Sequence, residues 1–110
     1  EESKLVLFSV PWEVTASYGG GTAQAPDAIL DASMQVDLYD VHNPGGWEQG
    51  IGTLEMDDTL NPRSNRLRQE ALQVMSHLEN GGALDSDFIQ RRLRRINKAS
   101  EELTIACRWD

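Results

Sequence analysis

The chain has 110 residues, a formal net charge of −8 and a single cysteine. This length suffices for one small domain with a modest core. The acidic balance argues against nucleic-acid binding, which needs a basic footprint, and no apolar run is long enough to cross a bilayer. Without a basic-then-apolar leader or a second cysteine, the composition indicates a soluble cytoplasmic protein with no membrane or nucleic-acid partner.

The chain opens with a predicted strand and a glycine-rich loop. Residues Leu5 to Val10 form a nearly unbroken run of β-formers, which predicts a strand buried on both faces and ended by Pro11. The loop runs from Trp12 to Ala25 and contains the triplet Gly19–Gly21. Proline followed by aspartate at 26–27 then favours a helix start, because proline loses no hydrogen bond there and aspartate complements the helix dipole.

The predicted helix is short and leads to a second predicted strand. We expect Ile29, Leu30 and Met34 to face a core. Residues Val36 to Asp40 alternate apolar and acidic side chains, which is typical of a strand with one solvent-exposed face. Strand, crossover helix and strand in this order predict a parallel βαβ unit over residues 1–40.

Two phosphate-binding motifs do not fit the glycine triplet. A P-loop needs a lysine and a hydroxyl residue after its last glycine, and here the sequence continues Thr22-Ala23-Gln24. Three adjacent glycines also cannot fill the separated positions of the dinucleotide fingerprint. A flexible connector that binds no ligand remains the alternative interpretation of the loop.

The first third of the chain resembles the N-terminal region of the ureohydrolases, the superfamily of arginase, agmatinase and formimidoylglutamase. The resemblance lies in Pro11 to Thr22, Ala25 to Ile29 and Ala32 to Asp40. It implies an α/β, arginase-like three-layer fold with a parallel sheet, of which this chain would hold the N-terminal βαβ unit followed by two helices. It also implies hydrolysis of a small guanidino or amidino substrate by water held between two Mn²⁺ ions, or Ni²⁺ in some relatives, in a homo-oligomer, either a trimer or a hexamer.

The same resemblance makes the glycine-rich loop a candidate pocket edge, without assigning it a catalytic residue. The candidate pocket-edge residues are Trp12, Thr15, Ser17, Tyr18, Gly21 and Thr22.

The family's metal ligands, two histidines and four aspartates in three short segments, are not found in the sequence. His42 is expected in a loop and His77 on a helix surface, and the Asp57-Asp58 pair lacks the further oxygen ligands that a hard cation needs. We therefore expect no metal ligand in this chain. We interpret residues 1–110 as a single N-terminal fragment of a ureohydrolase. The whole enzyme would be agmatinase- or guanidinase-like and would cleave a guanidine or amidine C–N bond, and we expect the fragment to be inactive alone.

Residues 41–60 are predicted to be a glycine-rich loop in which Trp47 anchors the chain to the core and Ile51 to Leu54 form one short strand. Residues 61–103 are predicted to be a helical pair. The first helix begins at Asn61-Pro62 and ends at Asn80-Gly81-Gly82. Its apolar face comprises Leu67, Ala71, Val74, Met75 and Leu78.

The second helix is predicted to begin near Asp85 to Asp87 and to carry a stripe of Ile89, Leu93, Ile96 and Leu103. The arginines at 91, 92, 94 and 95 surround this stripe, either as a solvated face or in contact with an acidic neighbour, which would be the acidic first half of this chain or another subunit. The alternative function is a non-enzymatic helical hairpin that docks a partner through Ile89, Leu93 and Ile96. For residues 104–110 the sequence leaves three interpretations open: a frayed helix end, a strand or a non-native terminus. Cys107 is expected to be a buried thiol.

Overall fold

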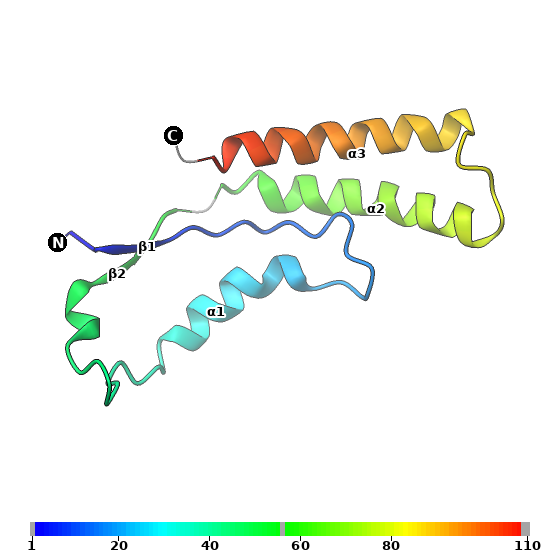
Figure 1. The fold of residues 1–110 in the computed structure, drawn as a ribbon. Coiled ribbons are helices and arrows are strands. Elements are labelled where there is room, and N and C mark those ends of the chain that lie inside the picture. Colours follow the sequence, from blue (N-terminus) through cyan, green and yellow to red (C-terminus); the bar gives the residue numbers. More distant parts are fainter. Residues whose placement is uncertain (1, 56, 109–110) are drawn as a thin grey trace. The chain divides into compact units, whose positions relative to one another are not determined.

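The computed structural model describes residues 2–55 and 57–108, which divide into two compact units. The first unit holds residues 1–12 and 20–61, and the second holds residues 13–19 and 62–110. The elements in chain order are β1 (Leu5–Leu7), η1 (Thr22–Gln24), α1 (Ala25–Ser33), η2 (Gly46–Gln49), β2 (Ile51–Thr53), α2 (Leu60–Glu79) and α3 (Asp87–Ala106) (Figure 1).

The first unit is a small parallel βαβ arrangement. Strands β1 and β2 pair in parallel, with Leu5 opposite Ile51 and Leu7 opposite Thr53. The ladder is extended at its ends by the Lys4 N–H donating to the Gln49 carbonyl at 2.9 Å and by Leu54 N–H donating to Leu7 at 3.0 Å. The predicted α/β class and parallel pairing through a helical crossover are therefore confirmed.

The second strand, β2, lies within Ile51 to Leu54, where a short strand was predicted. The prediction of a strand at residues 36–40 is wrong. Aspartate side chains close local turns there instead, because their carboxylates accept backbone N–H groups that a ladder would need. Asp37 Oδ1 accepts the N–H of Tyr39 at 2.9 Å, and Asp40 Oδ1 accepts that of His42 at 2.7 Å.

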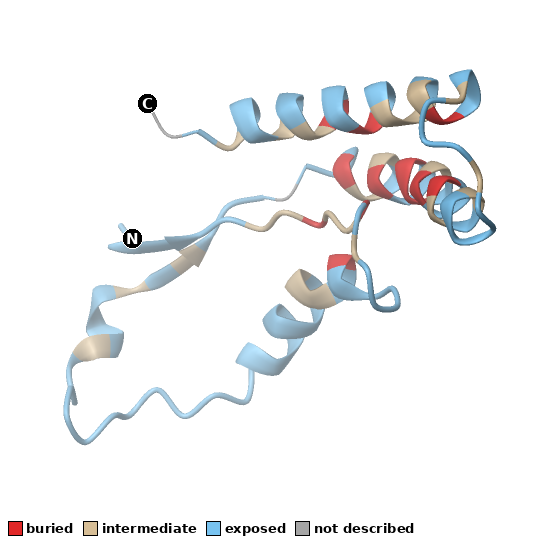
Figure 2. Ribbon diagram, turned by 45° about the vertical axis from the view of Figure 1, so that its right-hand side comes forward, coloured by how far each residue is buried: buried red, intermediate tan, exposed pale blue. Residues whose placement is uncertain are grey.

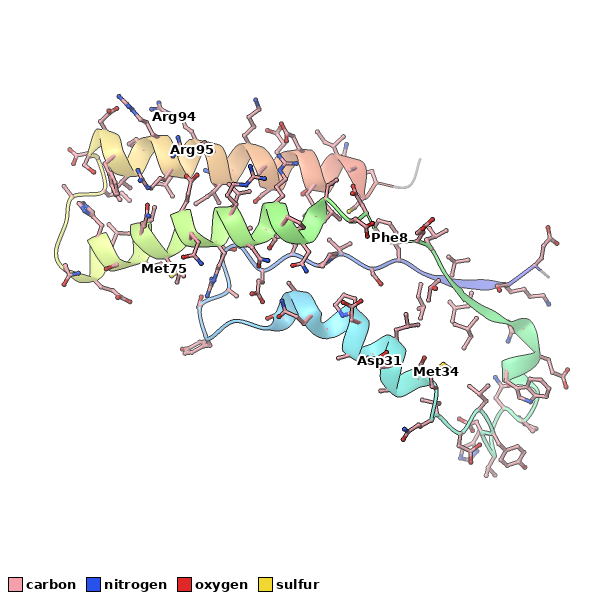
Figure 3. The ribbon with its side chains drawn as sticks, turned by 180° about the vertical axis from the view of Figure 1, so that it is seen from behind. Phe8, Asp31, Met34, Met75, Arg94 and Arg95 are labelled. Atoms are coloured by element: carbon pink, nitrogen blue, oxygen red, sulfur yellow. The ribbon has the colours of Figure 1, made fainter. Side chains whose placement is uncertain are left out.

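Most large apolar residues of the first unit are exposed, contrary to the prediction of a doubly buried strand, whereas Ala23 and Leu60 are buried. Leu5 is 51% exposed, and the other residues of β1 are also exposed. On α1, where Met34 lies at the end of the helix (Figure 3), the three residues expected to face a core are exposed as well. Trp47 lies in η2 with half of its surface exposed, so it does not anchor this loop in a core. A two-strand sheet has too little surface to cover these side chains.

The second unit carries most of the buried residues, and its helices run antiparallel beside each other (Figures 1 and 2). Its buried apolar residues are Val14, Leu67, Ala71, Val74, Ile89, Ile96 and Ala99. On α2 the predicted apolar face is confirmed at three positions, whereas Met75 is half-buried and Leu78 is exposed. On α3, Leu93 and Leu103 are half-buried.

The ends of both helices follow the expected signals with small shifts. Helix α2 begins at Leu60, two residues before Pro62, and ends in a turn where the N–H of Gly82 donates to His77 and that of Gly81 donates to Leu78. Gly81 has φ +77°, which glycine adopts without steric cost. The side chain of Ser86 caps α3 by accepting the N–H of Ile89 at 3.4 Å.

The tail is helical through Ala106, so α3 continues past the predicted end. Cys107 is a free, half-buried thiol at the C-cap. The part of the tail prediction that concerns residues 109–110 lies outside the described residues. No helix among the described residues is both long and apolar enough to traverse a bilayer.

Candidate functional site

The segment Glu13–Gly19, which contains three of the six candidate pocket-edge residues, is held against helix α2. The side chain of Val14 is fully buried. The backbone N–H of Glu13 donates to the hydroxyl of Ser64 at 3.0 Å, and Ser64 is itself fully buried. A valine anchor and a backbone hydrogen bond therefore fix the start of the segment to a single place on α2.

Arg68, one helical turn after Ser64, fixes the rest of the segment. Its guanidinium donates to the carbonyl oxygens of Val14 at 3.3 Å, of Gly19 at 3.4 Å and of Ala16. Only 9% of Arg68 is exposed, and it forms no ion pair with the described residues. Burial of a charge is costly without partners, so the three carbonyl dipoles are what stabilise this guanidinium in place.

The side chains of Thr15, Ser17 and Tyr18 are exposed while the backbone of the segment is fixed. Thr15 and Ser17 are exposed, and Tyr18 is 97% exposed. None of these three hydroxyl groups makes a hydrogen bond within residues 2–55 and 57–108. Two aliphatic hydroxyls and a phenol on a fixed backbone can bind a polar ligand, but a hydroxyl needs a neighbouring base to act as a nucleophile.

The other three candidate residues belong to the first unit. Trp12 is half-buried, and its backbone N–H donates to the carbonyl oxygen of Val10 at 2.9 Å. Gly21 has φ +117°, a conformation that favours glycine, and its carbonyl accepts the N–H of Gln24 at 3.1 Å. Thr22 is exposed and begins η1. These contacts give Gly21 a conformational role in the turn that leads into η1.

No metal-binding group is found among the described residues, where no three His, Cys, Asp or Glu side chains converge. The residues considered for such a site have other contacts. Asp57 accepts the N–H of Thr59 at 2.9 Å and its hydroxyl at 2.6 Å, and these hydrogen bonds lower the pKa of Asp57. His42 lies in an exposed loop, as predicted. His77 lies on α2 with Nε2 3.2 Å from the carbonyl oxygen of Ala83.

Sequence reasoning missed a groove on the hairpin of α2 and α3. It is an open depression of about 670 Å³ whose lining includes Gln73, His77 and Phe88. The rings of His77 and Phe88 lie 6.0 Å apart, and Arg92 stacks on Phe88 with Cζ 3.5 Å from the ring centroid. The antiparallel pairing of the helices brings these residues together, and no local pattern signals it.

The arginine cluster of α3 is mostly engaged within the hairpin. Arg91 pairs with Asp87 on the same helix at 2.6 Å, and the side chain of Arg94 is exposed and points away from α2 (Figure 3). Arg95 pairs with Glu70 of α2, with its Nε 2.8 Å from the carboxylate, so its acidic neighbour lies within the helical pair and not in the first half of the chain. Within the described part of the chain, the helices are joined by the ion pairs Arg63–Glu102 and Glu70–Arg95 and by a hydrogen bond from Arg92 to Gln73.

Comparisons with protein-family models, with curated proteins and with solved structures found no match.

Proposed function

We propose that this chain is the N-terminal segment of a binuclear-metal ureohydrolase, with the segment Glu13–Gly19 at the edge of the pocket for a guanidino or amidino substrate. The observation that carries the proposal is the fixed loop. Ser64 and Arg68 hold its backbone, while the hydroxyls of Thr15, Ser17 and Tyr18 are left for a ligand. Recognition loops of this kind combine a rigid backbone with exposed polar side chains.

The first unit supports the same proposal through its uncovered apolar surface. Its parallel strands carry exposed aliphatic side chains, as do α1 and the residues that follow it. Parallel sheets are ordinarily covered on both faces, so this unit fits a larger sheet whose other strands and helices would bury these side chains. A ureohydrolase sheet meets that requirement.

The role of the segment in the proposed enzyme is binding and orientation. A guanidinium or amidinium group carries N–H donors and a planar cationic face. Hydroxyl oxygens of Thr15 and Ser17 can accept its hydrogen bonds, and the ring of Tyr18 can stack on its face. The two metal ions of the family would supply the activated water. The described residues contain no group that fits them, so we assign no chemical step to this chain.

The purified chain provides a direct test. It should hydrolyse none of arginine, agmatine, formimidoylglutamate or guanidine with added Mn²⁺ or Ni²⁺, and calorimetry should detect no tight Mn²⁺ site. Turnover above that of the metal-only blank would show that catalytic ligands are present after all. A Gly-Gly-Asp-His segment encoded downstream of this sequence would support the assignment, and its absence there would count against it.

Burial weighs against the alternative of a hairpin that docks a partner through its α3 stripe. Ile89 is fully buried and Ile96 is 4% exposed, so both already pack inside the unit. Leu93 is half-buried. A partner could reach Ile89 and Ile96 only by opening the hairpin. Sedimentation separates the two functions, because a monodisperse folded oligomer of the chain would favour the module.

A further inference from the structure

The hairpin groove, the open depression on the hairpin of α2 and α3, runs along one face of α2. Its lining residues on that helix recur at spacings of three and four, which keeps them on one face. From residue 69 to residue 80 a helix rises by about 17 Å, so the groove is elongated. The lining residues on α2 are Gln69, Leu72, Gln73, Ser76, His77 and Asn80.

The turn after α2 and the start of α3 complete the lining of the groove. Gly82 lies against the ring of His77, and a Cβ at residue 82 would overlap that ring, so glycine is what allows the ring to lie there. Phe88 of α3 lies beside His77, with the two ring centroids 6.0 Å apart. Phe88 is 46% exposed and Leu72 is 41% exposed, and these two are the large apolar side chains of the lining.

Arg92 of α3 brings a fixed positive charge to the groove. Its Nε donates to Oε1 of Gln73 at 2.8 Å, and a terminal nitrogen donates to the carbonyl oxygen of Phe88 at 3.2 Å. Its Cζ stacks 3.5 Å from the centroid of the Phe88 ring. All of these partners are neutral. In the described part of the chain the ion pairs involve other arginines, so the guanidinium of Arg92 has no carboxylate partner there.

The charges around the groove favour an anionic occupant. None of the eight lining residues is acidic. Residues 62–110 hold nine basic and seven acidic side chains, although the whole chain has a net charge of −8. Exposed charges more than about 10 Å away are largely screened by salt, so the fixed guanidinium decides which charge the groove prefers. Because Arg92 is already held in place, it loses little conformational entropy when it binds a carboxylate.

The side-chain amides of the groove indicate the conformation of the occupant. The amide N–H groups of Gln69 and Gln73 have no partner among the described residues. An extended peptide offers free backbone carbonyls to such donors, whereas the backbone of a helix is already hydrogen-bonded. Five residues of extended chain span about 17 Å, which is the length of the groove. An open groove of this kind would leave a compact small molecule largely in solvent.

We propose that the hairpin groove binds an extended, acidic segment of a partner protein, about five residues long. A carboxylate of the segment pairs with Arg92, an apolar side chain covers Leu72 and Phe88, and backbone carbonyls accept from the two glutamines. This surface is separate from the stripe of Ile89, Leu93 and Ile96. The proposal does not depend on the assignment to the ureohydrolases.

A positional-scanning library of five-residue peptides, fluorescently labelled and amidated, provides the probe. Fluorescence anisotropy measures the binding of each pool to the full-length chain. At one position the wild-type chain should prefer Asp or Glu to Asn or Gln by at least roughly tenfold, because a hydrogen bond between two charged groups is the stronger one. Arg92→Met should lose this preference. Arg94→Met is the matched control and should keep it, because the side chain of Arg94 is exposed and points away from α2 (Figure 3).

A second pair of variants leaves Arg92 in place. Leu72→Glu puts a carboxylate into the groove and should weaken binding of the acidic pools at least roughly tenfold. Leu78→Glu is its control, because Leu78 lies on the same helix, is 40% exposed and is outside the lining. If circular dichroism shows that Arg92→Met has lost its helices, this second pair decides the question.

A wild-type chain that binds no pool, or that selects no acidic residue, would overturn the proposal. So would an acidic preference that neither Arg92→Met nor Leu72→Glu reduces. Sedimentation distinguishes the competing occupant. If the wild-type chain forms a dimer that Leu72→Glu dissociates and Leu78→Glu does not, the groove binds a second copy of the chain and the proposed partner is wrong.

Discussion

Replacing Arg68 with methionine tests the link between helix α2 and the candidate pocket-edge segment. Methionine keeps most of the length and the apolar stem of arginine but removes every donor. The change deletes three hydrogen bonds from a charged group, and each such bond contributes about 1.5–3 kcal/mol. Two of them are long, at 3.3 and 3.4 Å, so we count these two together as one bond. Two bonds at the lower end of that range give an expected loss of about 3 kcal/mol in unfolding free energy.

Urea unfolding followed by far-ultraviolet circular dichroism measures the loss, and amide hydrogen exchange locates it. Exchange should accelerate first in the segment Glu13–Gly19, before the amides of α3, because the segment depends on Arg68 and the helix does not. The matched control is Arg66→Met, whose effect should stay within about 0.5 kcal/mol. Arg68 does not hold the segment if Arg68→Met loses no more stability than that control, or if the segment exchanges at the wild-type rate in the variant.

The other predictions concern the hairpin. Ile89→Ala should cost about 2–5 kcal/mol by urea unfolding because Ile89 is fully buried, whereas Ile105→Ala, at a 59% exposed site, should cost less than about 0.5 kcal/mol. Gly81→Ala should cost about 1–2 kcal/mol because φ is +77°; an unchanged unfolding midpoint would contradict that geometry. Glu102 should titrate by NMR below its ordinary pKa because Arg63 hydrogen-bonds to its carboxylate, and Arg63→Met should raise that pKa. The stabilisation from this pair is present above the ordinary glutamate pKa and is lost as the pH falls through the lowered value; a pH profile unchanged by Arg63→Met would exclude it.

The helical pair could be predicted from the sequence because its signals are local. The serine at 86 and the glycine at 81 mark helix ends, and both do so in the structure. Apolar residues spaced by three and four, such as Leu67, Ala71 and Val74, lie on the buried face. The structure differs at the start of α2, where Asp57 accepts the N–H of Thr59 and the helix begins before its proline, and at the end of α3, which continues to Ala106.

The position of the second strand could not be predicted from alternation alone. Residues 36–40 and 51–53 both suit a strand, but Asp37 and Asp40 satisfy neighbouring backbone N–H groups with their own carboxylates. That local competition removes residues 36–40 from the ladder. The pairing of Leu5 with Ile51 is a contact over a long loop, which residue patterns do not encode.

In the candidate site, too, local features could be predicted from the sequence and long-range contacts could not. The sequence predicted a glycine-rich loop that presents Thr15, Ser17 and Tyr18, and the structure places all three at the surface. It did not predict Ser64 and Arg68, because polar residues in a helix ordinarily face solvent. Both are buried under a segment about fifty residues earlier in the chain, and only the fold reveals that contact.

A hybrid enzyme tests the proposed role of this chain as a pocket edge of a metal-dependent ureohydrolase. In the hybrid, residues 5–100 replace the corresponding N-terminal region of a manganese-dependent agmatinase. We expect the hybrid to fold, to bind Mn²⁺ and to release urea from agmatine, and we expect Tyr18→Ala to raise its KM. A folded, metal-loaded hybrid with no turnover above background would rule out this role.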